Sequence, residues 1–160
     1  MSDQSSEILR VGDEKLYIDQ VQPLEAFFKD YEMTPAKYWR LTALSSAENR
    51  GYCGTWEIKN NSLYLISIYA YRVVKKGFWF WKKVTYPEVN VSDLFPEAID
   101  GEIKATWFSG VFRAYSKTLR NPVDDCLWVK FENGEVVSHR WFHVNGKTRK
   151  DDIPYEKPLP

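Results

Sequence analysis

Alternating apolar and polar residues, separated by short polar turns, run through most of this chain. The clearest case surrounds Asn60-Asn61, which fits a two-residue turn. Ile58 then lies opposite Leu63. Two residues further from the turn, Trp56 lies opposite Leu65. Asparagine tolerates the positive φ angles that such a turn needs at both central positions, so the pattern predicts an antiparallel hairpin with one continuous apolar face.

A second hairpin is expected near the start of the chain, with Asp13-Glu14 as its turn. Val11 then faces Leu16 across the pair, and Leu9 faces Ile18. Both pairs place aliphatic side chains together, which is typical of a half-buried sheet.

A third hairpin has the strongest turn signal of the sequence, Asn133-Gly134, between LWVKFE and EVVSHRWF. In the simplest register Phe131 lies opposite Val136, and Trp128 lies opposite His139. We expect Trp56, Trp107 and Trp128 to fill the core.

The helical signals are short. A helix is predicted over 22–31, because Pro23 suits its first position and apolar residues follow at helical spacing. Ser92 is expected to cap a single turn that ends before Pro96. Strands are expected over 38–44 and over 103–114.

These elements predict a mainly β fold of the β-rich α+β type. We expect an antiparallel sandwich or partial barrel of several hairpins, with one or two short helices. The 160 residues suit one domain: residues 1–7 form a disordered tail, 8–146 a single β-rich domain and 147–160 a loosely attached C-terminal tail.

Composition narrows the class of protein. Twenty-two basic residues balance 22 acidic ones, whereas a nucleic-acid binder is expected to carry a basic surplus. The start of the chain lacks a signal-peptide pattern, and no stretch is long and apolar enough for a membrane span, so a cytoplasmic location is expected. Cys53 and Cys126 are predicted to be reduced thiols. Arg50 and Glu57 are candidates for an ion pair.

Several short motifs resemble those of a group of uncharacterised bacterial proteins. They are PLE at 23–25, RGY at 50–52, GTWEI at 54–58, LYL at 63–65, LFP at 94–96 and AxWFSG at 105–110. The chain departs from that group by an insertion around residues 75–83 and by the stretch 117–126. The resemblance implies one domain in a bacterial cytoplasm, and it supplies no catalytic residue.

Catalytic and metal chemistry find little support in the sequence. On a strand, His139 and His143 would lie about 13 Å apart, too far to share a metal ion. Cys53 and Ser109 lack the sequence context of a catalytic nucleophile. No carboxylate pair, phosphate-binding loop or cofactor motif stands out, so we expect no cofactor and lean against an enzyme.

The segment KKGFWFWKK is the other candidate for function. As a strand it places Phe78 and Phe80 on one face, and Trp79 and Trp81 on the other. It could form an exposed platform for a protein, a sugar ring or an anionic lipid surface. Burial of one pair on the core and the other under a loop is the preferred interpretation. If the segment is exposed, the partner-binding residues are Phe78, Trp79, Phe80, Trp81, Lys75, Lys76, Lys82 and Lys83.

The resulting functional prediction is a non-catalytic bacterial interaction protein that binds another protein. An immunity protein that neutralises a cognate toxin is one such role. A small-ligand or carbohydrate-binding β-domain is the first alternative. A hydrolase that brings distant carboxylates together is the second.

Overall fold

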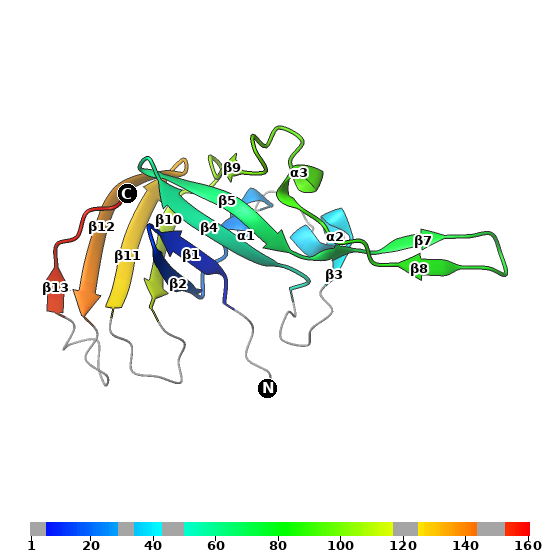
Figure 1. Cartoon of the computed structure of the whole chain (residues 1–160), viewed down its shortest axis with the longest axis horizontal. Helices are drawn as coiled ribbons and strands as arrows, with labels where there is room; N and C mark the ends of the chain where they lie inside the picture. Colours follow the sequence, from blue (N-terminus) through cyan, green and yellow to red (C-terminus); the bar gives the residue numbers. More distant parts are fainter. Residues whose placement is uncertain (1–5, 29–33, 43–49, 117–124, 144–152) are drawn as a thin grey trace.

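The computed structural model describes residues 6–28, 34–42, 50–116, 125–143 and 153–160. It shows a β-barrel body from which a long hairpin extends along the longest axis of the molecule (Figure 1). The three helices of the described residues lie on the side of the body from which this hairpin leaves.

The described strands are β1 (Ile8–Val11), β2 (Glu14–Asp19), β3 (Leu41–Thr42), β4 (Cys53–Lys59), β5 (Ser62–Tyr69), β6 (Tyr71–Arg72), β7 (Val74–Lys76), β8 (Lys83–Thr85), β9 (Ile103–Lys104), β10 (Gly110–Tyr115), β11 (Asp125–Glu132), β12 (Glu135–His143) and β13 (Ile153–Tyr155). The helices are α1 (Pro23–Phe27), α2 (Pro35–Trp39) and α3 (Val91–Leu94).

Seven strands form the barrel, in the order β12-β11-β10-β2-β1-β4-β5. Pairing of Glu135 with Ser62 joins β12 to β5 and closes the sheet. Neighbouring strands are antiparallel except β1 and β4, which run parallel. The predicted mainly β fold is therefore confirmed. Of the two expected architectures the chain adopts the barrel, in a closed form.

The central hairpin has the predicted register. Asn60-Asn61 forms the turn with φ angles of 50° and 59°. Ile58 pairs with Leu63, and Trp56 pairs with Leu65. All four side chains are fully buried. Turn chemistry and the apolar pattern agree here, which explains why the local sequence determines the pairing.

The first hairpin forms, but its predicted turn is wrong. The turn is Gly12-Asp13, so Leu9 pairs with Leu16 and Val11 pairs with Glu14. Gly12 has a φ of 60°, a conformation that glycine adopts at little cost. The shift amounts to two residues and therefore leaves the same side chains facing the core.

In the third hairpin the predicted pair Phe131–Val136 is confirmed, whereas the predicted pair Trp128–His139 is wrong. A bulge leaves Val137 without a partner on β11, so Trp128 pairs with Arg140, one residue further on than predicted. Trp128 is half-buried, on the opposite face from its fully buried neighbours in β11, and it does not fill the core as expected.

The barrel interior is filled by side chains. Trp56, whose burial confirms the prediction, and Trp141 are both fully buried. The bulge in β12 reverses the alternation of its side chains, which turns Trp141 inward. Trp107, half-buried, packs against this core from outside the barrel strands, with its ring centroid 6.5 Å from that of Trp56.

The helices differ from the prediction in number and position. Helix α1 begins at Pro23 as expected, and the end of the predicted helix lies partly outside the described residues. Helix α2 replaces the first part of the strand expected over 38–44. The Thr34 side chain accepts a hydrogen bond from the Lys37 amide, and Pro35 occupies the first turn. Pro35 therefore begins a helix that the sequence pattern did not predict.

Helix α3 is capped by Asn90, not by Ser92. Asn90 and Asp93 form a reciprocal capping box, with side chain to backbone hydrogen bonds of 3.1 and 2.9 Å. The strand expected over 103–114 is divided into β9 and β10 by residues 105–109.

The two ends of the chain are more closely attached than expected. Strand β13 pairs with β12, which places part of the predicted loose tail in the sheet. Glu7, assigned to a disordered tail, is buried, and its carbonyl accepts a hydrogen bond from the Ile18 amide at 2.8 Å. Cys53 and Cys126 are both thiols, as predicted. Among the described residues, no helix combines the length and apolar character needed to cross a membrane.

Candidate functional site

The hairpin that projects from the body carries the predicted contact residues at its end. We call residues 74–85, with β7 and β8, the arm, and residues 78–81 the aromatic tip. The four residues of the aromatic tip form the turn of the arm rather than a strand. Their exposed fractions are 87% for Phe78, 79% for Trp79, 82% for Phe80 and 85% for Trp81. The preferred interpretation, burial of these rings, is therefore wrong.

The backbone of the aromatic tip has a defined conformation. The Trp81 amide donates a hydrogen bond to the Phe78 carbonyl at 3.0 Å, and Trp79 has a φ of 35°. Gly77 precedes the turn with a φ of 131°. A Cβ atom at Gly77 would lie 1.7 Å from the Trp81 carbonyl oxygen, so only glycine fits there.

The base of the arm is hydrogen-bonded to the body. Strand β6 pairs with β3, and the Arg72 amide donates to the Pro87 carbonyl at 2.9 Å. The Val73 amide donates to the carbonyl of Arg40, at the end of α2, also at 2.9 Å. These bonds fix the direction in which the arm leaves the body.

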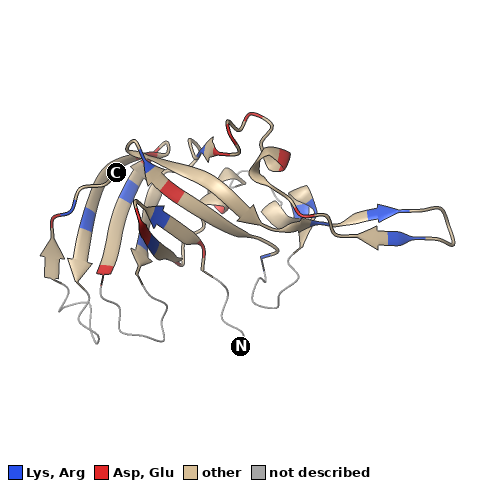
Figure 2. Cartoon of the chain, viewed as in Figure 1, with Lys and Arg blue, Asp and Glu red and all other residues tan. Residues whose placement is uncertain are grey.

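The arm is positively charged on both sides of the aromatic tip. Lys75, Lys76, Lys82 and Lys83 are all exposed, and Lys76 pairs with Lys83 across the hairpin. Residues 71–87 contain these four lysines, Arg72 and no acidic residue. Figure 2 shows basic residues on both strands of the arm, whereas basic and acidic residues are mixed over the body.

A buried carboxyl group forms a second cluster. Glu7 is 1% exposed, and the Trp56 indole Nε1 donates a hydrogen bond to Glu7 Oε2 at 2.7 Å. Arg50 Nη1 lies 4.0 Å from Oε1, so Arg50 has Glu7 rather than Glu57 as its ion-pair partner. Burial raises the pKa of Glu7 to about 7, although Arg50 and the Trp56 hydrogen bond act in the opposite direction.

Glu7 and Tyr52 are each only 1% exposed, so neither side chain reaches a surface that a substrate could contact. Burial also raises the pKa of Tyr52, whose hydroxyl has no hydrogen-bond partner among the described residues. A raised pKa keeps the phenol protonated at neutral pH, so the phenolate that could accept a proton is not populated. Gly54 leaves room for the buried groups, since a Cβ there would lie 2.9 Å from Trp56 Nε1. We assign this cluster to the packing of the barrel.

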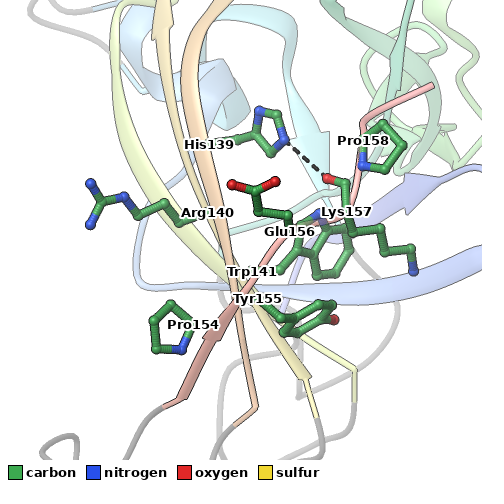
Figure 3. Close-up of a pocket in the computed structure, with 8 residues that line it drawn as sticks. All are labelled: His139, Arg140, Trp141, Pro154, Tyr155, Glu156, Lys157 and Pro158. Atoms are coloured by element: carbon green, nitrogen blue, oxygen red, sulfur yellow. Dashed lines mark hydrogen bonds between the residues drawn. The ribbon is translucent and has the colours of Figure 1, made fainter.

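A cavity of about 900 Å³ lies between β12 and the C-terminal segment (Figure 3). It is lined by His139, Arg140, Trp141, Pro154, Tyr155, Glu156, Lys157 and Pro158. Its size suits a small ligand. However, Trp141 is fully buried, and the Tyr155 ring stacks on His143 with centroids 4.1 Å apart. The Trp141 ring is therefore closed to a sugar, and one face of the Tyr155 ring is already occupied by His143.

The two histidines have separate partners. His139 Nε2 lies 3.1 Å from the Lys157 carbonyl, and His143 Nδ1 lies 2.9 Å from Asp125 Oδ1. In the part of the chain that the structure describes, no three His, Cys, Asp or Glu side chains form a group that could hold a metal ion.

Two carboxylates line another surface cavity, of about 570 Å³, beside β5 and α3. They belong to Glu88 and Asp100, and both residues are exposed. A glycosidase-type general acid needs a desolvated carboxyl group, which an exposed position does not provide. This cavity therefore gives little support to the hydrolase alternative.

Comparisons with known proteins leave the arm as the main clue to function. No protein-family model, curated protein or solved structure matches the chain. The resemblance to uncharacterised bacterial proteins thus stays a prediction based on the motifs alone.

Proposed function

We propose that this protein is a non-catalytic interaction protein whose contact element is the arm. The observation that carries the proposal is the exposure of the aromatic tip, in which each of the four rings is at least 79% exposed. Together they present an apolar surface on the order of 600 Å², at the upper end of what a soluble monomer leaves uncovered. Contact with a partner would remove this surface from water.

The barrel does not need the aromatic tip for its stability. Its interior is filled by other side chains, and the rings of the aromatic tip lie outside the hydrophobic core. Such a surface favours association, because burial of aromatic side chains supplies much of the binding energy at protein contacts.

The test is the double variant Trp79→Ala, Trp81→Ala. We expect the free energy of unfolding to change by less than about 0.5 kcal/mol, because neither ring is buried. Partner binding should be lost. The matched control is Ile99→Ala with Val137→Ala, which removes exposed apolar side chains from the body. Equal binding by both variants would argue against the arm as the contact element. A large fall in the stability of the tryptophan variant would place those rings in the core.

A second candidate role is that of an immunity protein that neutralises a partner toxin. The fixed shape of the aromatic tip, with Gly77 against the Trp81 carbonyl, supports insertion into a preformed cleft of another protein. The bacterial resemblance implied by the motifs agrees with this role. The test is co-purification with the product of the adjacent gene. Failure of that capture, with normal growth of cells that lack this protein beside its neighbour, would contradict the role.

A further inference from the structure

We propose that the partner surface of the arm is an anionic lipid bilayer. The aromatic tip would enter the interface between headgroups and acyl chains while the four lysines contact lipid phosphates. This inference rests on the proposed function, which makes the arm the contact element, and it names the chemical class of the partner.

The order of residues along the arm matches the layers of a bilayer surface. The four rings form the far end, and the paired Lys76 and Lys83 are the first strand residues behind them. Along an extended chain, two residues span roughly 7 Å, close to the depth at which interfacial side chains sit below the phosphates. Lysine stems are long and apolar enough to keep the ammonium groups at the phosphates.

The composition of the arm favours lipid over a protein cleft. Tryptophan is enriched at membrane interfaces, where its ring is apolar and its indole N–H can be hydrated. Lysine is depleted at protein–protein interfaces, which prefer arginine. Residues 74–85 carry four lysines, no arginine and no acid. Clustered lysines beside apolar side chains are typical of segments that bind anionic lipids.

The charge of the whole chain points to contact through the arm alone. Residues 71–87 hold five of the 22 basic residues and none of the 22 acidic ones. The remainder therefore has 17 basic against 22 acidic residues, a net charge of −5. An anionic surface would attract the arm and repel the body, which favours an end-on approach.

The first experiment is co-sedimentation of the full chain with vesicles. Phosphatidylcholine vesicles are compared with vesicles of equal parts phosphatidylcholine and phosphatidylglycerol, at low and high salt. We expect binding to the anionic vesicles, weakened by salt, and little binding to phosphatidylcholine alone. Tryptophan fluorescence should shift to shorter wavelength as Trp79 and Trp81 leave water. The variant Trp79→Phe, Trp81→Phe should still bind and lose this shift.

A matched pair of variants tests the role of the lysines. Lys76→Gln with Lys83→Gln removes two charges from the arm, whereas Lys15→Gln with Lys130→Gln removes two exposed charges from the barrel. We expect the arm variant to bind anionic vesicles about thirtyfold more weakly, at about fivefold for each lysine near the surface. The barrel variant should bind at least as well as the natural chain. Equal weakening by both variants would show attraction by net charge alone and would overturn the proposal.

A permuted tip separates lipid from protein recognition. The variant Phe78→Trp, Trp79→Phe, Phe80→Trp, Trp81→Phe keeps the composition and changes the shape. Partition into a fluid bilayer should change by less than about threefold, because it depends on apolar content rather than on fit. Absence of arm-dependent binding to the anionic vesicles overturns the lipid proposal. If the arm then captures the adjacent gene product and the permuted tip does not, the arm is a protein contact and only the proposed function stands.

Discussion

Glu7 illustrates how much one residue depends on parts of the chain far from it. Its carboxyl is covered by the barrel and bonded to an indole 49 positions further along the sequence. Because water cannot stabilise the carboxylate there, burial raises its pKa from 4.5 to about 7. The group therefore stays protonated in the folded protein over a range of pH in which it is ionised in the unfolded chain.

This shift predicts a fall in stability as the pH rises from 4.5 to about 7. In that range the folded state holds a proton that the unfolded state has released, so unfolding becomes easier by up to about 3 kcal/mol. The variant Glu7→Gln, measured by urea unfolding across the same range, should lose this dependence. Glu97→Gln, at an exposed loop position, should keep it. Parallel stability curves for the natural chain and Glu7→Gln would contradict the shift.

At the scale of single residues, the sequence predicts the pairing and burial of the side chains of the central hairpin. It does not predict the burial of Glu7. The residue lies beside a polar, acidic start that is typical of a frayed tail. Only the closed barrel covers it, and no short-range pattern reports that closure. The exposure of Trp79 and Trp81 was equally hard to predict, because alternating aromatic residues fit a buried strand as well as a protruding turn.

Among the elements, hairpins were predicted well where the turn residues determined the geometry. Asn60-Asn61 and Asn133-Gly134 favour positive φ angles and therefore a two-residue turn. The bulge at Val137 was not predictable in the same way. The residues around it, from Glu135 to Arg140, include no glycine that would mark a bulge in the sequence.

The tip of the third hairpin gives a test of barrel closure. Gly134 has a φ of 79°, its carbonyl accepts a hydrogen bond from the Leu63 amide at 2.8 Å, and a Cβ would lie 2.6 Å from the Ala105 carbonyl oxygen. We expect Gly134→Ala to lower the free energy of unfolding by about 3 kcal/mol or more, from backbone strain plus steric overlap. Thermal or urea unfolding measures the loss.

The matched control for this prediction is Gly101→Ala. Gly101 has a similar φ of 76°, and a Cβ there would meet no atom within 4 Å. Its replacement should cost only the strain of the left-handed conformation, about 1 kcal/mol. Equal losses at the two glycines would mean that the approach of the hairpin tip to residue 105 contributes nothing.

For the whole molecule, the arm is expected to be separable from the fold. Val74 pairs with Thr85, so residues 75–84 can be replaced by Asn-Gly as a two-residue turn. The melting temperature should change by less than about 4 °C, because the removed side chains lie outside the core. Binding to anionic vesicles should disappear. A collapse of the fold in this variant, seen by circular dichroism, would show that the arm supports the barrel.

The architecture itself was predicted only to the level of its class. Many short strands and frequent turns indicate a mainly β chain, which the structure confirms. The sequence does not reveal that β1 runs parallel to β4, since this pair joins segments more than 40 residues apart. Closure through Ser62 and Glu135 is a contact of the same long-range kind.

The direction of the arm has a consequence for how the molecule would be oriented. The arm leaves along the longest axis, and β13 with the adjacent part of β12 lies at the opposite end (Figure 1). With the aromatic tip inserted in a bilayer, the long axis of the protein would stand roughly perpendicular to the membrane surface. The cavity lined by Trp141 would then lie at the end of the body that faces away from the membrane, where molecules in solution can reach it.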